Sequence, residues 1–496
     1  MVWTRLKKAL WLTLGCATAL AGCRKEEEVP YFLPLWEQKT KFIAPRPAVA
    51  IDIDADGLNE IVLSDSRGHV VVFQGESGKR LWSQTIEEAS LTAPVAGHFW
   101  GDGSLDVAVA DNAGLVYLFN GANGELLQKM DIGKSVAIAP TVLPPDPPGG
   151  GTEGTPPELR DRLLLVGDGN TLFSLVFDPD PARAVIQWES PLSGRALAPA
   201  SVGDVDGDGR FEVAIGVAVS RQGLLHVLHA DTGMPLTNSP EEIPTNVLTA
   251  VSLADVDGNG RDEMFFGTAS SRLSGQLSGY RYETEQERFW PLWSPQAIVQ
   301  KPESDPLLFQ DDRRGGWAAV VQGRNLLVIR PLSGTLSPGR EADEVTQSPI
   351  TSRLGLMTGD SQAKLRVIFG DELGGVYDWY LEGPSEKQSA QFKNLQLGQT
   401  PVLADFDGEP GAEVLLCFPR EGVLRVMKIT DTPYPAEPGA IVWQTRAGTL
   451  WRAGWRDEAG YYSALRQRYA HIAGQVDRRM AEAQGARVVR QHVELE

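Results

Sequence analysis

One motif recurs along most of this chain: an apolar strand, a short turn and a second apolar strand. Its eight copies begin at Glu60, Asp106, Arg162, Glu212, Glu263, Trp317, Leu365 and Glu413. Successive copies start 46 to 56 residues apart. A repeat of this length corresponds to one four-stranded blade of a β-propeller. We therefore expect an all-β propeller, although 496 residues would by length alone suggest two or three domains.

The other two strands of each blade are also visible. A short apolar strand precedes the motif, as in APVAGHF and TPVLADF, and an outer strand follows it, as in GESGKRLWSQT. Trp82 in that outer strand has counterparts at Trp36, Trp188, Trp293 and Trp443. A Trp at this place can lie across the next blade and donate its N–H to a backbone carbonyl. Scattered surface Trp residues are the alternative.

The ends of the repeat region bear on how the ring closes. Trp36 and Trp443 are 407 residues apart, close to eight repeats. A strand around Trp36 can complete the last blade and so remove an open sheet edge. Because Trp443 competes for the same place, seven blades or an extra edge strand stay open beside eight blades. We expect the propeller to cover residues 33–445.

Four of the repeats are preceded by a nine-residue acidic loop. The loops read DIDADGLNE from Asp52, DVDGDGRFE from Asp204, DVDGNGRDE from Asp255 and DFDGEPGAE from Asp405, with oxygen-bearing side chains at positions 1, 3, 5 and 9. An acidic turn needs no such register. Ca²⁺ does, because it takes six to eight oxygens at roughly 2.3–2.6 Å.

The sequence therefore predicts three Ca²⁺ sites and a fourth, weaker one. The ligands of the three, each set including the carbonyl of position 7, are Asp52, Asp54, Asp56, Leu58 and Glu60; Asp204, Asp206, Asp208, Arg210 and Glu212; and Asp255, Asp257, Asn259, Arg261 and Glu263. The fourth set is Asp405, Asp407, Glu409 and Glu413. It is weaker because Pro410 replaces the Gly that allows the sharp bend.

The loop pattern D-x-D-x-[DN]-G-x-x-E resembles the FG-GAP (VCBS-type) repeats of integrin-α-like β-propellers, in which such loops bind Ca²⁺. The resemblance covers roughly 48–445. In the second repeat, HFWGDGSLD has His98 and Trp100 in place of the first two carboxylates, so we expect no metal there. The outer-strand Trp residues also resemble quinoprotein-type propellers, including the lipoprotein of the outer-membrane barrel-assembly machinery. Neither resemblance fixes a function.

The N-terminus predicts export and anchoring. Basic residues precede the apolar stretch ALWLTLGCATAL, which is shorter than the ~20 residues of a membrane span and is typical of a secretory signal. LAGC, ending at Cys23, resembles the bacterial lipobox, which implies cleavage after residue 22 and acylation of Cys23. Several acyl chains would hold the protein on a membrane stably. Arg24 follows in place of a retention Asp and favours the outer membrane; an ordinary signal with a chance Cys is the alternative.

Two segments fall outside the repeats. Residues 144–160 are rich in Pro and Gly and predict a loop inserted in the third blade, and residues 23–32 form a tether. In the tail 446–496, apolar residues spaced three and four apart predict an amphipathic helix. It either packs on the propeller or binds a partner.

Composition narrows the function classes. The net charge of −19 comes without a basic stripe, which argues against nucleic-acid binding. Outside the signal and Cys23, Cys417 is alone and is expected to be a buried thiol. His226 and His229 lie three residues apart on one expected strand, so they point to opposite faces and do not readily bind one ion together.

No HExxH, GxSxG or phosphate-binding loop occurs in the sequence, so we expect no enzyme. The expected function is recognition of a protein or glycan at the cell envelope by a Ca²⁺-stabilised lipoprotein. An envelope assembly scaffold and a Ca²⁺-dependent carbohydrate-active enzyme are the alternatives.

Overall fold

The computed structural model describes residues 32–429, with internal gaps. The residues it leaves undescribed within that range are 43–44, 55, 103, 145–159, 180–181, 272–273, 299–301, 303, 312–314, 323–324, 336–349, 351, 353–354, 358–365, 381–386, 393–394, 396, 398, 400 and 410–411. The predicted signal, Cys23, almost all of the tether and of the insert, Trp443 and the C-terminal helix lie outside the described residues. Within the described part, no helix is long and apolar enough to cross a bilayer.

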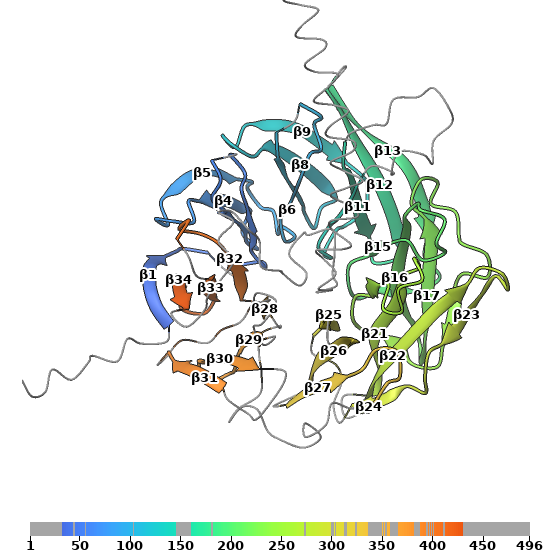
Figure 1. The fold of residues 1–496 in the computed structure, drawn as a ribbon. Helices are drawn as coiled ribbons and strands as arrows, with labels where there is room; N and C mark the ends of the chain where they lie inside the picture. The colour runs from blue at the N-terminus through green and yellow to red at the C-terminus, as the bar shows by residue number, and fades with distance from the viewer. Residues whose placement is uncertain are drawn as a thin grey trace, which may run out of the picture.

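The strands form eight antiparallel sheets arranged in a ring, which we call blades 1 to 8 (Figure 1). Blade 1 contains β2 (Val49–Ile51), β3 (Glu60–Ser64), β4 (His69–Phe73) and β5 (Arg80–Thr85); blade 2 contains β6 (Val95–Gly97), β7 (Asp106–Ala110), β8 (Leu115–Asn120) and β9 (Leu126–Asp131); blade 3 contains β10 (Thr141–Leu143), β11 (Arg162–Gly167), β12 (Thr171–Pro179) and β13 (Ala182–Pro191). The all-β propeller is confirmed.

Blades 4 and 5 contain more strands because the inner strand of each is interrupted, and in blade 5 an additional short strand pairs with β22. Blade 4 contains β14 (Arg195–Ala196), β15 (Ser201–Gly203), β16 (Glu212–Val219), β17 (Gln222–His229) and β18 (Glu241–Ile243). Blade 5 contains β19 (Asn246–Val247), β20 (Ser252–Ala254), β21 (Glu263–Ser271), β22 (Ser274–Glu283), β23 (Arg288–Pro291) and β24 (Gln296–Ile298). In each blade, two short inner strands pair with one long second strand.

The last blades bring the ring back to its start. Blade 6 contains β25 (Leu307–Asp311), β26 (Gly315–Gln322) and β27 (Asn325–Ile329); blade 7 contains β28 (Gly355–Met357), β29 (Arg366–Gly370), β30 (Gly375–Tyr380) and β31 (Lys387–Gln391); blade 8 contains β32 (Val402–Ala404), β33 (Ala412–Phe418), β34 (Val423–Ile429) and β1 (Phe32–Lys39). The N-terminal strand β1 pairs antiparallel with β34, with Phe32 opposite Ile429. It closes the last blade, as the position of Trp36 predicted (Figure 1).

Each described outer-strand Trp reaches the next blade. The indole N–H donors bond to backbone carbonyls as follows: Trp36 to Gly75 at 2.6 Å, Trp82 to Gly121 at 2.6 Å, Trp188 to Ala230 at 3.0 Å and Trp293 to Pro331 at 2.6 Å. Three residues after each carbonyl stands a Gly of positive φ under the indole ring. An added Cβ on Gly124, for example, would lie 2.6 Å from Trp82. The predicted docking of these Trp residues is confirmed.

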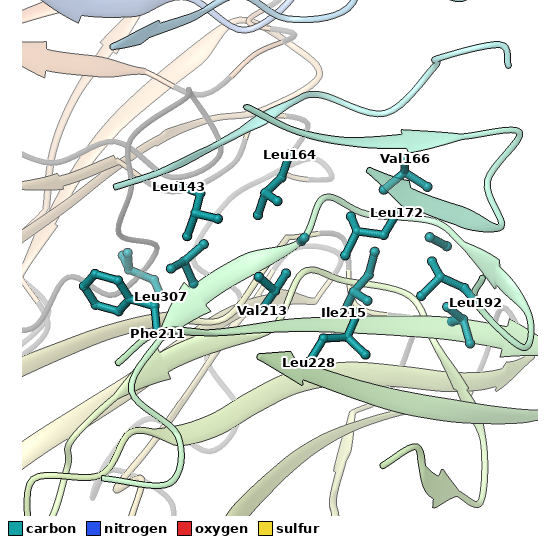
Figure 2. Packing of buried hydrophobic residues seen from close by; sticks show 14 of the residues in the cluster. Leu143, Leu164, Val166, Leu172, Leu192, Phe211, Val213, Ile215, Leu228 and Leu307 are labelled. Atoms are coloured by element: carbon teal, nitrogen blue, oxygen red, sulfur yellow. The ribbon is translucent and has the colours of Figure 1, made fainter. Parts of the chain in front are cut away.

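Apolar side chains fill the spaces between neighbouring blades. One cluster joins Leu143, Leu164 and Leu172 of blade 3 to Val213 and Ile215 of blade 4 and continues to residues of blades 6 and 7 (Figure 2). These residues come from alternate positions of strands that are buried on both faces. Because each blade is held from both sides, the loops at its ends rest on a rigid scaffold.

Candidate metal centres and a basic groove

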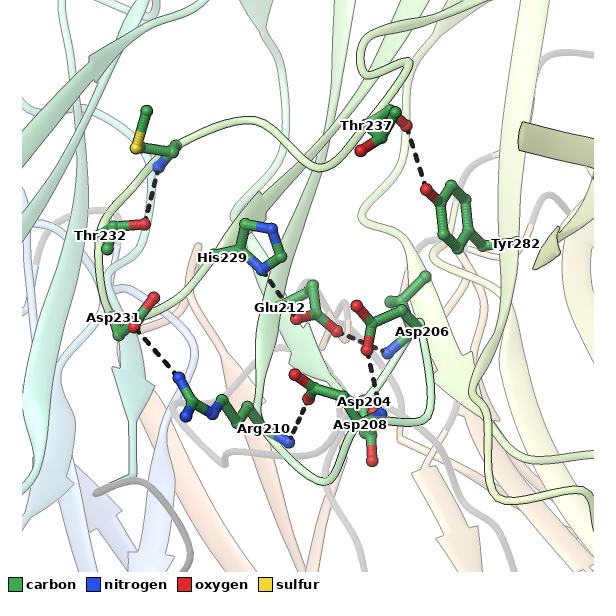
Figure 3. A network of polar contacts seen from close by, with 12 residues as sticks. Asp204, Asp206, Asp208, Arg210, Glu212, His229, Asp231, Thr232, Thr237 and Tyr282 are labelled. Atoms are coloured by element: carbon green, nitrogen blue, oxygen red, sulfur yellow. Dashed lines mark hydrogen bonds and ion pairs between the residues drawn. The ribbon is translucent and has the colours of Figure 1, made fainter. Parts of the chain in front are cut away.

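The acidic loops connect the inner strand of a blade to its second strand and fold around their own carboxylates. In blade 4, Asp204 accepts hydrogen bonds from the N–H groups of Gly207 (2.8 Å) and Gly209 (3.0 Å). Asp206 accepts one from Asp208 at 3.1 Å. Gly207 and Gly209 adopt φ of 80° and 82°, which Gly permits at little steric cost. These turns bring one carboxylate oxygen each of Asp204, Asp206 and Asp208 within 4.8 Å of one another, and Figure 3 shows the three side chains.

The loops of blades 1 and 5 repeat this arrangement. Asp52 accepts from Gly57 at 3.1 Å, and Asp255 accepts from Gly260 at 2.8 Å. In blade 8 the equivalent donor position is Pro410, which has no N–H. The weakness predicted for that loop therefore has a second cause besides backbone freedom.

The ninth residue of each loop, which we call the closing residue, is buried at the start of the second strand. Its Oε2 accepts the N–H of the second loop residue: Ile53 to Glu60 at 3.1 Å, Val205 to Glu212 at 2.9 Å, Val256 to Glu263 at 2.9 Å and Phe406 to Glu413 at 2.9 Å. Glu212 and Glu413 are 0% exposed, and their Oε1 atoms find no hydrogen-bond partner among the described residues. A buried carboxylate oxygen in that state needs a cation or a proton.

The protonation of the closing residues reflects this environment. Burial, and then repulsion from Asp206, raises the pKa of Glu212 to about 9. Burial also raises the pKa values of Glu60 and Glu263 to about 8 and that of Glu413 to about 7. A bound dication would reverse this effect by favouring the ionised form.

The structure brings most of the predicted ligands together. The clusters whose ligand atoms lie within 4.8 Å of one another are Asp52, Asp54, Asp56 and Glu60; Asp204, Asp206 and Asp208; Asp206, Glu212 and His229; Asp255, Asp257 and Glu263; and Asp405, Asp407 and Glu413. Glu409 is not among them. Ligation by the carbonyls of Leu58, Arg210 and Arg261 and by the Asn259 side chain stays a prediction. In blades 1, 4 and 5, the residues fit a hard dication.

Blade 8 differs because it supplies its own cation. The Lys428 ammonium lies 2.9 Å from Asp407 Oδ2 and 3.7 Å from Glu413 Oε1. A Ca²⁺ ion would have to displace this ammonium group. The fit to Ca²⁺ is therefore poorer in blade 8 than in the other three loops.

The blade 2 loop is built from other contacts. His98 Nδ1 lies 3.0 Å from the Ser104 carbonyl, and Asp102 accepts from the Ser104 N–H at 2.9 Å. Asp106 at the closing position accepts the Trp100 N–H at 2.8 Å. Asp106 thus fastens the loop to the second strand even though His98 and Trp100 replace the first two carboxylates of the pattern.

Three residues that the sequence analysis missed fasten these loops to the neighbouring blade. Asp262 of blade 5 accepts the N–H of Asp204 at 2.9 Å, and Asp161 of blade 3 accepts that of His98 at 2.7 Å. Asn59 of blade 1 donates to the Asp405 carbonyl at 3.0 Å. The only sequence signal was a polar residue just before the start of the second strand.

A second feature is a groove of about 600 Å³ between the end of β1 and the strands β4 and β5. Its charged and aromatic lining residues are Lys39, Lys41, Phe42, His69, Lys79 and Arg80. None of the described lining residues is acidic, in a chain of net charge −19. The four Lys and Arg side chains form no ion pair with the described residues, so we call this the basic groove.

His69 in the basic groove has a structural partner. Its Nδ1 lies 2.8 Å from Oδ2 of the buried Asp65. Asp65 Oδ1 accepts from the N–H of Arg67 and His69 in the β3–β4 turn. Asp111 and Asp371 hold the same turn in blades 2 and 7. The Asp65–His69 pair therefore belongs to a recurring hairpin and does not by itself indicate catalysis.

No family model matches the sequence, and no curated protein matches it. Solved structures with a similar fold include Sqt1 of Saccharomyces cerevisiae (TM-score 0.56, 12% identity, 80% of this chain and 99% of that chain) and the exotype rhamnogalacturonan lyase YesX (TM-score 0.54, 16% identity, 83% and 77%). BamB from Moraxella catarrhalis is also similar (TM-score 0.51, 13% identity, 80% and 99%).

These comparisons establish the fold of the chain. At 12 to 16% identity they carry no function, and one of the three structures is named as an enzyme. The chain is thus a β-propeller whose activity has to be argued from its own residues.

Proposed function

We propose that this chain is a non-catalytic, Ca²⁺-stabilised β-propeller lipoprotein of the cell envelope that is anchored through Cys23 and binds a protein or glycan partner. The observation that carries the Ca²⁺ part is the blade 1 cluster, in which oxygens of Asp52, Asp54, Asp56 and the buried closing residue Glu60 lie within 4.8 Å of one another. Three loops of the same design gather carboxylates around such a residue. A Ca²⁺ ion would supply the positive charge that balances these carboxylates.

The Ca²⁺ ions would act structurally. Each loop joins two strands of one blade, and the blade 4 loop is also fastened to blade 5 through Asp262. An ion bound only by the folded protein adds about 2.7 kcal/mol at a hundredfold excess over its dissociation constant. Ca²⁺ would thus stiffen one face of the ring.

The basic groove is the candidate partner site. Its cationic and hydrogen-bonding side chains suit a partner that presents anionic groups. The net negative charge of the chain as a whole would repel such a partner from other surfaces. A propeller that holds rigid loops and grooves around a closed ring is well suited to recognition.

Thermal unfolding of the full-length chain tests the Ca²⁺ proposal. We expect the midpoint to rise with Ca²⁺ after chelation, and to rise much less with Mg²⁺, which demands octahedral geometry. Asp255→Asn should reduce the gain. Asp102→Asn, in the blade 2 loop, is the matched control and should not. An unchanged midpoint across the Ca²⁺ titration would leave the loops as acidic turns.

Binding of polygalacturonate and of polyglutamate to the full-length chain tests the basic groove. Reversing Lys79 and Arg80 to Glu should weaken binding of the anionic probe at least about 10-fold, because a like charge then faces the ligand. The pair Lys129→Glu and Arg221→Glu, at exposed positions outside the groove, makes the same change of net charge and is the control. Equal losses in both variants would place the partner site elsewhere.

A further inference from the structure

The residue opposite each closing residue differs from blade to blade. In the antiparallel ladders, Glu212 faces His229, Glu413 faces Lys428 and Asp106 faces Asn120. Continuing the printed registers places Gln74 opposite Glu60 and Arg281 opposite Glu263. Of these five positions in the described strands, blade 4 alone carries an imidazole.

His229 lies inside the cluster. Its Nδ1 is 3.5 Å from Glu212 Oε1, the buried oxygen without a hydrogen bond, and one ligand atom each of Asp206, Glu212 and His229 lies within 4.8 Å of the others. Figure 3 shows the imidazole ring beside the Glu212 carboxylate, with Asp206 close by. The side chain of Glu212 is 0% exposed, whereas that of His229 is 38% exposed, so an ion could reach the cluster from the solvent side.

This set of ligands differs in kind from the all-oxygen loops of blades 1 and 5. Ca²⁺ takes oxygen ligands, whereas imidazole suits Zn²⁺ and other divalent transition metals. Zn²⁺ binds nitrogen and oxygen at about 2.0–2.2 Å, so two ligands of a tetrahedral site lie roughly 3.3–3.6 Å apart. The 3.5 Å between His229 and Glu212 falls in that range.

We infer that blade 4 binds a divalent transition metal, of which Zn²⁺ is the probe, through Asp206, Glu212 and His229. The inference builds on the metal-binding role proposed for these loops and changes the metal in the blade 4 loop, which would otherwise hold Ca²⁺. Three protein ligands leave a fourth position for water or for a carboxylate of Asp204 or Asp208. The chain then carries two kinds of metal site: oxygen-only loops in blades 1 and 5 and a mixed nitrogen–oxygen site in blade 4.

Competition of the full-length chain with a fluorescent Zn²⁺ chelator tests the inference. We expect one Zn²⁺ per chain, with His229→Gln weakening its binding at least about 10-fold. Gln is the residue that blade 1 places at the equivalent position, so the variant keeps a side chain that this fold accepts. His98→Gln in blade 2 is the matched control and should bind Zn²⁺ as the unchanged chain does.

X-ray absorption of the Zn²⁺-loaded, unsubstituted chain needs no variant and should show one imidazole among oxygen ligands. An all-oxygen shell, or a His229→Gln chain that binds Zn²⁺ as tightly as before, would overturn the inference. The Ca²⁺ titration separates it from the proposed function. If Ca²⁺ stabilises the chain and Zn²⁺ does not bind, only this inference fails; if Zn²⁺ binds and Ca²⁺ has no effect, only the Ca²⁺ role fails.

Discussion

At the residue scale, the two oxygens of Glu212 have different tasks. Oε2 fastens the loop to the strand through the Val205 N–H, and Oε1 is buried without a hydrogen bond among the described residues. Glu212→Gln should keep the first contact and remove the group that titrates. We expect this variant to unfold later than the original chain in chelator, by on the order of 1–2 kcal/mol, because burial raises the pKa of Glu212 to about 9 and the free-energy cost of protonating this carboxyl on folding is then gone.

The same Glu212→Gln variant should gain less stability from added metal ions. Two thermal scans, one in chelator and one with metal, measure both effects. Glu189→Gln on the outer strand β13 controls for the loss of an acidic charge outside the loops. A variant that loses stability in chelator would assign Glu212 a purely structural role.

His226 gives a pH dependence that is independent of the metal loops. It is 3% exposed, and burial lowers its pKa to about 4. Its Nε2 accepts the Ser193 N–H at 3.3 Å, which requires the neutral ring. Because the folded-state pKa lies below the unfolded value, its contribution to stability is present above pH 6.5 and is lost as the pH falls toward 4.

The loss should approach about 1.4 kcal/mol per pH unit in that window. Urea unfolding of the original chain and of His226→Gln between pH 4 and 7.5 measures it as a difference in slope. His98→Gln should leave that difference in place. Parallel pH profiles for the original chain and His226→Gln would mean that His226 titrates normally in the folded state.

The sequence predicts residues whose role repeats along the chain. The acidic side chains and the outer-strand Trp residues recur at fixed positions of the repeat, so one copy supports another. Asp262 and His229 escaped prediction because their partners lie on another blade or another strand, and only the strand pairing brings them together. The only indication in the sequence is that Asp262 is an acidic residue of the loop DVDGNGRDE that does not stand at a ligand position.

At the element scale, the Trp and the Gly beneath it act as one unit that joins two blades. Gly124 (φ 73°) lies under Trp82, whereas Gly133 (φ 68°) has nothing within 4 Å of an added Cβ. Ala at either position carries the strain of a positive φ, about 1–2 kcal/mol. Only Gly124→Ala should also push the indole away from the Gly121 carbonyl.

We therefore expect Gly124→Ala to lower the free energy of unfolding by at least about 2 kcal/mol more than Gly133→Ala does. Urea unfolding followed by far-UV circular dichroism measures the difference between the two variants. Equal losses for the two variants would show that the close packing of Trp82 on Gly124 adds nothing to stability.

Strand positions were predicted well where the apolar pattern is continuous. The motif starts predicted at Trp317, Leu365 and Glu413 fall within two residues of the observed starts of β26, β29 and β33. The division of the inner strand in blades 4 and 5 was not predicted. In blade 4, for example, β14 and β15 both pair with the one long strand β16. The local sequence does not predict this pairing.

At the scale of the whole molecule, the ring depends on one strand from the far end of the sequence. β1 pairs with β34 along its length, and Trp36 continues the contact onto Gly75 of blade 1. Removal of residues 1–39 should open the ring and expose the edge of β34. We expect a loss of about 3–5 kcal/mol and a fall in the unfolding midpoint of roughly 3–6 °C, because the shift is only about 1 °C per kcal/mol in a chain this large.

A circular permutant distinguishes closure from a general truncation effect. Phe32 lies opposite Ile429, so a short turn can join residue 429 to residue 32 and a new N-terminus can be placed at residue 45. This permutant supplies the same strand from the other end of the chain and should recover most of the lost stability, measured by thermal unfolding. If it stays as unstable as the truncated chain, β1 stabilises the propeller through something other than closing blade 8. If the truncated chain unfolds like the original, seven blades and the remaining strands of the eighth hold the ring by packing alone.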